Sequence, residues 1–439
     1  MLILDKDILR ISDKVTFKKI KNDYYINTNY DKDYRLENLS SEIFDLIYKQ
    51  KELQDIVNIL QNRYKVSKKT IERDVYALIN KLIKLRILEY NNKTKEIVSC
   101  GTKENLACGV KTETDIFKKG HKQNIPINVD FHVTYKCNLK CKHCYAADQY
   151  KNNSSEELTF NEIIDMLDQL DEMGVFYLRI TGGEPFIHPY FLDILNYAYK
   201  KKFAVSIVTN GTLLDDKIIN RLKRFNLRKM TFSLHGGNSD THDFFVGVNG
   251  SFEKLKANIL KCKKAGIPIE ISWTVTKDSV KDLELVKKLG KELNVPLGIS
   301  TRIIPQINGK LSPKKWRLTS TQLTKFIIEN KYKLQPLECT IGNKLQINSD
   351  GTVQPCLFVN DIIGNIKEDK IKDIWDKLVK NRSKWYKDFY VEPVECKECK
   401  YNINCHRCPG VAKIENGSPN SCSETSKWEA ESFYLSKYI

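Results

Sequence analysis

Between residues 127 and 302 the sequence alternates short apolar runs with longer segments of helical periodicity. An alternation of this kind is typical of a parallel sheet covered by helices, so the region is predicted to be an α/β domain. The predicted strands are 127–134, 175–180, 204–208, 230–234, 268–275 and 296–302. The predicted helices are 159–174, which opens with a capping box of Thr159 and Glu162, 191–201, 215–224, 252–266 and 280–293.

The loop after the first predicted strand carries three cysteines in the spacing C-x3-C-x2-C, namely Cys137, Cys141 and Cys144. A [4Fe–4S] cluster with a purely structural role takes four cysteines. Three close cysteines therefore predict a cluster with one iron left open for a ligand. The alternative is a structural zinc site with His143 as the fourth ligand, because zinc takes four ligands.

The loop after the second strand reads Gly182-Gly183-Glu184-Pro185. Two glycines let the backbone approach a ligand closely, and a fixed carboxylate at Glu184 suits an ammonium group. In parallel sheets, ligands bind at the carboxyl ends of the strands. Both loops follow strands, so they are expected to meet at one site.

Together the two motifs resemble those of the radical S-adenosylmethionine (SAM) enzymes. The resemblance implies a partial (β/α)6 barrel in which Cys137, Cys141 and Cys144 hold the catalytic [4Fe–4S] cluster and SAM binds its open iron. It also implies that SAM is contacted by glycines, a carboxylate and polar strand ends, namely Gly182, Gly183, Glu184, Asn210 and Ser233.

The chain departs from the family at two places. Relatives often read Ser-Leu-Asp-Gly where 233–236 is Ser-Leu-His-Gly, and they often carry arginine where Val246 stands. Another cation must then pair with the carboxylate of SAM, and Arg302 is predicted for that role.

The C-terminal part is rich in cysteines at metal-binding spacing: Cys339, Cys356, Cys396, Cys399, Cys405, Cys408 and Cys422. Two zinc sites would account for the close pairs, but the spacing resembles the SPASM domain, which holds two auxiliary [4Fe–4S] clusters. The resemblance assigns Cys396, Cys399, Cys405 and Cys422 to the distal cluster. It assigns Cys339, Cys356 and Cys408 to the nearer one, whose fourth ligand is open. Cys262 is a weaker candidate and is expected to pack as a small hydrophobic residue.

The first part of the chain predicts three strands, 15–20, 23–28 and 33–37, followed by three helices. One helix is expected after an N-cap at Ser40, the second over 52–64 and the third after Ser67. This pattern resembles the PqqD-like recognition element, a winged-helix-like domain that binds the leader of a ribosomal precursor peptide. The resemblance places the leader as an added strand beside 34–37 and against 68–73. A DNA-binding winged helix or a structural cap is the alternative.

Composition limits the compartment and the partners that this chain can have. No long apolar run suggests a signal peptide or a membrane span, so a cytoplasmic protein is expected. Thirteen cysteines then favour metal ligation over disulfides. The net charge of +17 comes from lysines scattered along the chain. An acidic peptide therefore suits it as partner, and a nucleic acid partner is not expected. Cys100 and Cys108 lie in a polar linker and fit no motif.

The predicted domains are a recognition element (1–92), a linker (93–126), the radical SAM core (127–310), a bridging region (311–335) and the SPASM domain (336–439). The whole resembles the sactipeptide synthases, which implies that a ribosomal precursor peptide gains a thioether between a cysteine sulfur and a carbon. A reductant such as flavodoxin or ferredoxin is the second expected partner. The alternatives are a carbon–carbon or carbon–oxygen crosslinking or epimerising maturase and, more distantly, a non-catalytic iron–sulfur DNA-binding regulator.

Overall fold

The computed structural model describes residues 9–28, 32–90, 110–112, 120, 123–147, 156–333, 343–359, 361–383 and 391–437. The chain divides into two compact units, which are considered separately. The first consists of Met1–Ile116 with Tyr199–Ala204 and Asn226–Arg228, and the second contains the rest. Cys100, Cys108 and Cys339 lie outside the described residues.

The first unit is built on an antiparallel sheet of order β2-β3-β4-β6. Its strands are β2 (Val15–Ile20), β3 (Asp23–Thr28), β4 (Lys32–Leu36) and β6 (Val110–Thr112). Its helices are α1 (Leu39–Tyr48), α2 (Leu53–Tyr64) and α3 (Lys68–Lys84), and β1 (Leu9–Ile11) pairs with β5 (Leu88–Tyr90). The three predicted strands and three predicted helices are present, whereas β1 and β6 were not predicted.

Helix capping in this unit follows the expectation at one helix and not at another. Ser67 caps α3, and its side chain accepts a hydrogen bond from the backbone N–H of Thr70. The prediction of Ser40 as the cap of α1 is wrong, because Asn38 stands at that position and Ser40 is buried within the first turn. The helix begins at Leu39, so the Ser40 side chain lies inside the first turn and is not at the cap position.

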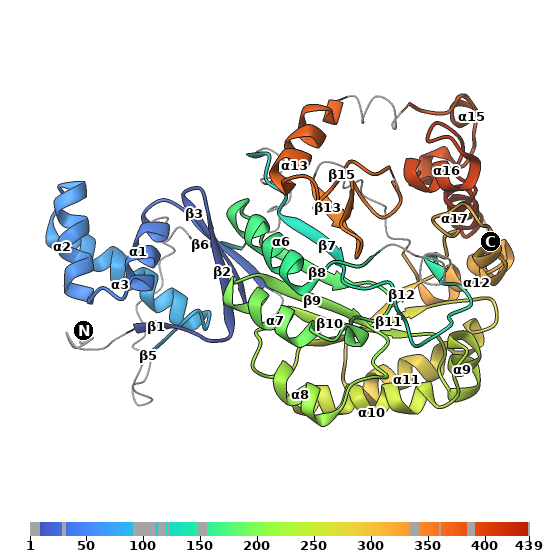
Figure 1. The fold of residues 1–439 in the computed structure, drawn as a ribbon, viewed down its shortest axis with the longest axis horizontal. Coiled ribbons are helices and arrows are strands. Elements are labelled where there is room, and N and C mark those ends of the chain that lie inside the picture. Colours follow the sequence, from blue (N-terminus) through green and yellow to red (C-terminus); the bar gives the residue numbers. More distant parts are fainter. Residues whose placement is uncertain are drawn as a thin grey trace. The chain divides into compact units, whose positions relative to one another are not determined.

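The second unit contains the predicted parallel sheet, and the α/β class with a partial barrel is confirmed (Figure 1). Its parallel strands are β7 (Asn128–His132), β8 (Tyr177–Thr181), β9 (Ala204–Thr209), β10 (Lys229–Leu234), β11 (Ile269–Thr274) and β12 (Leu297–Ser300). The helices between them are α6 (Phe160–Glu172), α7 (Phe191–Lys200), α8 (Asp216–Leu222), α10 (Ser251–Lys264) and α11 (Leu283–Leu293). The capping box of Thr159 and Glu162 is present at the start of α6.

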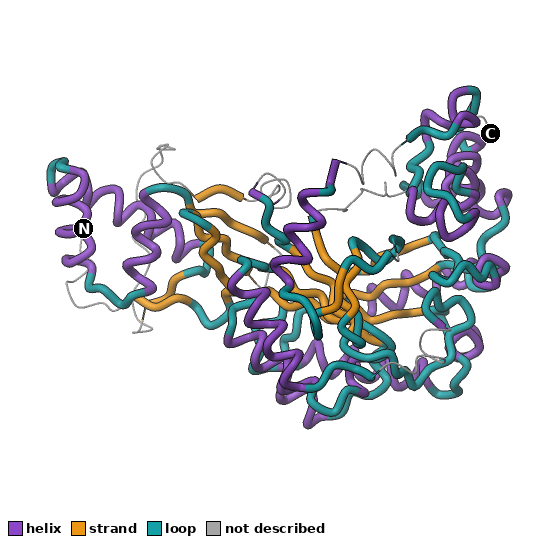
Figure 2. Tube along the Cα trace, turned by 45° about the horizontal axis from the view of Figure 1, so that its top comes forward, coloured by secondary structure: helices purple, strands orange, loops and turns teal. Residues whose placement is uncertain are grey.

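The two faces of this sheet differ in character. On β10, Met230, Phe232 and Leu234 are buried, while Thr231 and Ser233 between them are partly exposed. A similar alternation recurs on β11, where Ile271 and Trp273 are buried and Ser272 and Thr274 are partly exposed, and on β9 the partly exposed residues are Ser206 and Val208. Because neighbouring residues of a strand point to opposite faces, the apolar face is the one that the helices cover (Figure 2). The other face is mostly polar, and on β9, β10 and β11 it is partly exposed.

The C-terminal part continues the same sheet. Strand β13 (Lys344–Ile347) pairs in parallel with β7, and β14 (Thr352–Gln354) and β15 (Gly364–Asn365) follow, so the described strands run β12-β11-β10-β9-β8-β7-β13-β14-β15. The Lys344 ammonium bonds the buried Asp130 carboxylate of β7 at 3.0 Å. The remaining helices are α12 (Ser320–Asn330), α13 (Ile371–Lys380), α15 (Val394–Lys397), α16 (Pro409–Asn416) and α17 (Glu424–Leu435).

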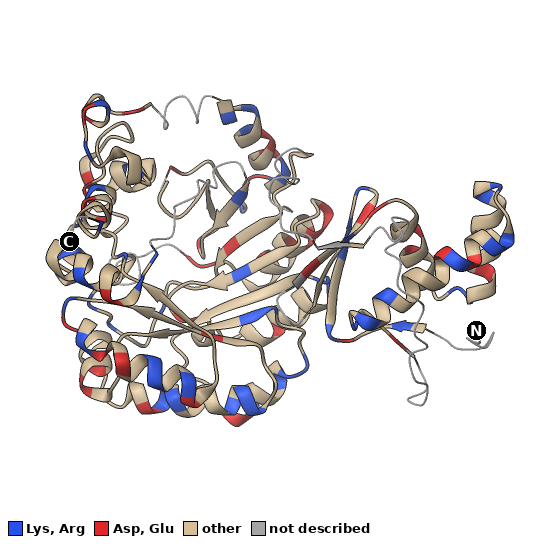
Figure 3. Ribbon diagram, turned by 180° about the vertical axis from the view of Figure 1, so that it is seen from behind, with Lys and Arg blue, Asp and Glu red and all other residues tan. Residues whose placement is uncertain are grey.

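The surface charge is mixed. Lys and Arg alternate with Asp and Glu over the described helices, as Figure 3 shows. None of the helices in the described part of the chain is both long enough and apolar enough to cross a membrane.

Candidate functional site

A cavity of about 420 Å3 opens at the carboxyl ends of the barrel strands. The last residues of four strands that face the open side line it, namely Thr181, Val208, Ser233 and Thr274. The cysteine loop, with Cys137, Cys141 and Cys144, and the Gly182-Gly183 turn form other walls. The two loops that the sequence places after the first two strands therefore meet at one site.

The cysteine loop is fixed to the glycine turn through the backbone. The N–H of Gly183 donates to the carbonyl of Thr134 at 2.8 Å, and the N–H of Glu184 donates to the carbonyl of Lys136 at 2.8 Å. A Cβ at position 182 would stand 2.4 Å from the Thr134 carbonyl oxygen, and Gly182 has φ +137°. Only glycine permits this close approach of two backbones.

The other side of the cysteine loop is held by a helix that the sequence did not suggest, α9 (Ser239–Val246). The N–H of Lys140 donates to the carbonyl of Val246 at 2.8 Å, and the N–H of Lys142 donates to that of Phe245 at 2.9 Å. The Asn238 cap and the left-handed Gly247 that ends the helix were readable signals. Val246, where relatives often have arginine, thus supports the cysteine loop through its backbone.

The three cysteines lie close enough to affect one another. Burial, and then the charges of Cys144 and Cys137, raise the pKa of the Cys141 thiol. In the described part of the chain, no group of three or more His, Cys, Asp or Glu is arranged to hold a single metal ion. Three adjacent thiols around a cavity suit a larger iron–sulfur cluster, whose irons would keep the sulfurs ionised.

Glu184 is a buried carboxylate that directly follows the Gly182-Gly183 turn, and it lies behind the residues that line the cavity rather than among them. Burial raises its pKa to about 7. It accepts hydrogen bonds from the Thr209 hydroxyl at 2.8 Å and from the backbone N–H of Asn210 at 2.7 Å. A buried carboxylate without a cation favours a positively charged group beside it, which agrees with the predicted contact to an amino group.

Three of the other predicted SAM contacts, Asn210, Ser233 and Arg302, do line the cavity. The Asn210 amide donates to Asn138 at 2.9 Å and accepts from the Thr212 hydroxyl at 2.7 Å. The Arg302 guanidinium forms two bonds to the Glu429 carboxylate, at 2.8 and 2.5 Å. Glu429 thus compensates the charge that was predicted to bind a carboxylate. All these roles stay predictions.

Two histidines meet at the cavity, His143, which the sequence offered only as an alternative zinc ligand, and His235, for which it predicted no ligand role. His143 and His235 both line the cavity, and their rings meet edge to face with centroids 4.6 Å apart. Burial lowers the pKa of His143 to about 4, so the ring is neutral. The Nδ1 atoms of both rings are buried and have no hydrogen-bond partner among the described residues. Buried nitrogens of this kind usually contact a ligand or water.

The C-terminal cysteines gather in the two predicted sets, as far as they are described. Burial, and then the charges of Cys396, Cys422 and Cys399, raise the pKa of Cys405 to about 11. These are the four cysteines that the resemblance assigns to the distal cluster. Their role as ligands stays a prediction.

The nearer set is described in part. Burial raises the pKa of Cys356 to about 11, with Cys408 among the charges that contribute, so these two lie together. Their predicted partner Cys339 is outside the described residues. Cys262 lies buried in α10, and burial alone raises its pKa to about 12. This agrees with a packing role.

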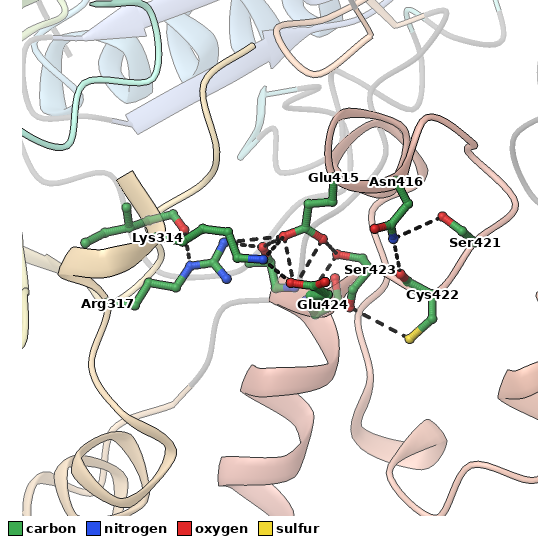
Figure 4. Close-up of polar contacts among 11 residues, drawn as sticks. Lys314, Arg317, Glu415, Asn416, Ser421, Cys422, Ser423 and Glu424 are labelled. Atoms are coloured by element: carbon green, nitrogen blue, oxygen red, sulfur yellow. Dashed lines mark hydrogen bonds and ion pairs between the residues drawn. The ribbon is translucent and has the colours of Figure 1, made fainter. Parts of the chain in front are cut away.

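A buried ionic network lies beside the distal set (Figure 4). The Glu415 carboxylate is fully buried and accepts hydrogen bonds from the Ser423 hydroxyl at 3.0 Å and the Thr425 backbone N–H at 3.2 Å. The Arg317 guanidinium, itself 8% exposed, lies 3.5 Å away. Ser423 follows Cys422, so the network fixes the backbone on which this cysteine stands.

Comparison with known proteins agrees with this architecture. The Radical SAM superfamily model matches residues 131–293, the model for coenzyme PQQ synthesis protein D (PqqD) matches 26–88, and the SPASM iron-sulfur cluster-binding domain matches 339–409. The chain is therefore a radical SAM enzyme. More particularly, it carries a PqqD-like domain before the radical SAM domain and a SPASM domain after it.

Individual relatives differ in what they share with the chain. An AdoMet-dependent heme synthase of Methanosarcina barkeri is 28% identical over 331 residues, which are 67% of this chain and 94% of that protein. The subtilosin biosynthesis protein AlbA of Bacillus subtilis is 35% identical over 155 residues, 34% of each chain. SuiB of Streptococcus suis, solved with its precursor peptide SuiA, has TM-score 0.58 and 17% identity, covering 95% of this chain and 100% of that one.

The matched domains indicate which cofactors the chain binds. Radical SAM and SPASM domains hold [4Fe–4S] clusters, and SuiB has also been solved with S-adenosylmethionine. The predicted cofactors, SAM with one SAM-binding and two auxiliary clusters, are therefore confirmed. The non-catalytic regulator loses its support, because the chain is a radical SAM enzyme.

Proposed function

We propose that the chain matures a ribosomal precursor peptide by forming a thioether between a cysteine sulfur and a carbon of the same peptide. The observation that carries the proposal is the combination of a PqqD-like domain with the cavity at the radical SAM loops and the two cysteine sets. AlbA is a subtilosin biosynthesis protein and SuiB has been solved with a precursor peptide, and both relatives support a peptide as the substrate.

The residues of the cavity have distinct tasks in this proposal. Cys137, Cys141 and Cys144 would hold the SAM-binding cluster. The cluster and SAM together, when bound, supply a 5′-deoxyadenosyl radical that abstracts hydrogen. Glu184 would hold the amino group of SAM in a buried site. The hydrogen bonds that fix Glu184 also fix its orientation before SAM arrives, and a preorganised site loses little free energy in ordering its groups.

Glu157 keeps the cysteine loop in register with this site. Its carboxylate accepts a hydrogen bond from the backbone N–H of Tyr135 at 2.7 Å and one from the Thr134 hydroxyl at 2.8 Å. Both donors lie directly before Cys137. Glu157 is therefore a positioning residue rather than one that touches SAM.

The thioether is the finer part of the proposal and rests on the nearer cysteine set. Cys356 and Cys408 lie together, Cys339 is assigned to them, and no fourth cysteine is assigned. An iron with an open position suits a thiolate of the substrate. The reaction removes one hydrogen atom from carbon, one proton from the thiol and one electron, which an iron–sulfur cluster is suited to accept. The electron that starts the cycle comes from a reductant such as flavodoxin or ferredoxin.

The heme synthases among the relatives favour a second candidate, a tetrapyrrole substrate. The aligned part of that relative covers 67% of this chain. The chain also has a PqqD-like domain, and a tetrapyrrole substrate would give this domain no function. Carbon–carbon or carbon–oxygen crosslinking and epimerisation remain alternatives for a peptide substrate.

Mass spectrometry of the peptide encoded beside the gene, after anaerobic turnover with SAM and reductant in heavy water, tests the proposal. A loss of two hydrogens with one cysteine no longer alkylated would support a thioether. The same loss with all cysteines free would indicate another crosslink, and deuterium gain without net loss would indicate an epimerase. An unchanged peptide beside a converted tetrapyrrole would overturn the proposal. C141A is the inactive control, and C262A, a buried cysteine outside the sets, is its matched counterpart.

A further inference from the structure

The edge of the N-terminal sheet is covered by a segment of the chain itself. Strand β4 pairs with β6 in antiparallel register, with Leu36 opposite Val110, Arg35 opposite Lys111 and Tyr34 opposite Thr112. Residues 110–112 lie outside the PqqD match, which ends at 88, and before the radical SAM match, which begins at 131. A linker segment therefore completes a sheet that the domain forms without it.

The contacts of β6 are those that a bound peptide strand would make. Val110 is 8% exposed and belongs to the core of this unit together with Leu36 and α3 residues such as Leu78. The Lys81 ammonium of α3 donates to the Val110 carbonyl at 3.2 Å. An added strand gains affinity from main-chain pairing and selectivity from side-chain pockets. Here β4 supplies the pairing edge, the core supplies an apolar pocket, and Lys81 supplies a cation.

The pairing of β6 is short as far as the chain is described around it. It has three described residues, whereas β2 and β3 have six each and pair along their whole length. Ordering a short segment costs conformational entropy for every residue, while few contacts offset that cost. Segments with few buried contacts open at low free energy. A longer peptide with more pairing residues would therefore compete well for the same edge.

We propose that β6 is a resident strand that an incoming peptide replaces on the edge of β4. This inference rests on the proposed function, since the partner is the leader part of the precursor peptide. The site selects an extended segment with a β-branched residue in the Val110 pocket and favours acidic side chains near Lys81. Only molecules in which β6 has left the edge can bind the leader. The apparent affinity for the leader is therefore the intrinsic affinity multiplied by the fraction of molecules whose edge is free.

The first test needs no identified precursor. The probe is a fluorescein-labelled peptide copying residues 106–117 with Cys108→Ser, titrated into the full-length protein and followed by anisotropy. The variant Val110→Asp weakens the resident strand, because a carboxylate would enter an apolar pocket. It is expected to bind the probe at least tenfold more tightly than the wild type. Val66→Asp is the matched control, because Val66 is 41% exposed, and it should bind as the wild type does.

The outcomes separate the possibilities. Equal affinity of the V110D and wild-type proteins for the probe would overturn the inference. Hydrogen exchange of the wild type is the second measurement, in case V110D folds poorly. Amides of 110–112 should exchange at least tenfold faster than those of β3, and equal protection would likewise overturn the inference. If the leader of the precursor binds without displacing the probe from V110D, the leader uses another surface, and the inference fails while the proposed function stands. If the probe behaves as expected but no peptide is matured, then a peptide can replace β6 on the edge of β4, and the proposed function fails.

Discussion

Replacing Glu415 by alanine should strongly destabilise the C-terminal part of the chain. The side chain is fully buried, and its removal deprives the Arg317 guanidinium, 8% exposed, of its main neutralising partner, with only the weaker influence of Glu429 and Glu424 left. Breaking a buried ion pair on one side costs about 3–5 kcal/mol. The substitution also frees the Thr425 N–H in the first turn of α17 and the Ser423 hydroxyl, and each lost hydrogen bond adds about 1 kcal/mol. The expected loss is therefore roughly 5–7 kcal/mol.

Urea unfolding of the anaerobically purified protein measures this loss, with iron per chain as the second readout, because Ser423 follows the proposed ligand Cys422. Glu424→Ala is the matched control. Its carboxylate pairs with Lys314 but is 60% exposed, so its loss should stay near 0.5 kcal/mol. Arg317→Met in the E415A background should restore part of the stability, because the unpaired charge is gone. A loss below about 1.5 kcal/mol in E415A, or purely additive effects in the double variant, would refute the reasoning.

Three further predictions concern other parts of the chain. Burial acts to raise the pKa of Asp45, but hydrogen bonds from two lysines and a tyrosine outweigh it and lower the pKa from 3.8 to about 2. This stabilisation is present above pH 3.8 and is lost as the pH falls toward 2, so D45N should flatten the acid limb of a circular dichroism titration. An added Cβ in G183A would lie 2.0 Å from the Lys136 carbonyl oxygen, so calorimetry should give SAM binding at least tenfold weaker, about 1.4 kcal/mol. C356A should lose about four irons per chain while C262A keeps them, and equal iron in the two would contradict the assignment.

Local patterns predicted most elements because they depend on residues close in sequence. The period of the apolar residues located the barrel strands, and Thr159 with Glu162 located the start of α6. The misses have a common physical cause. Strand β6 is paired by β4, far away in the sequence, and three residues carry too little periodicity to be recognised.

The sequence predicted the cysteines of the site better than the contacts that hold the site residues in place. The cysteine spacing brought three thiols to one cavity, whereas the bond of Arg302 to Glu429 joins residues 127 positions apart and leaves no local trace. The role of α9 was hidden for a related reason, because it supports the cysteine loop through backbone carbonyls. Carbonyls are the same in every residue, so side-chain identity could not reveal these contacts.

The polar, open face of the barrel sheet has a consequence for how such a chain diversifies. In a barrel with a filled interior, each inward residue is constrained by its packing neighbours. Here Ser206, Thr231 and Ser272 face the open side and are only partly buried, so the sheet is stabilised through its helix-covered face. Substitutions at such positions usually change stability by less than about 0.5 kcal/mol. The lining can therefore drift toward new peptide sequences, by natural variation or in a designed library, while the scaffold remains folded.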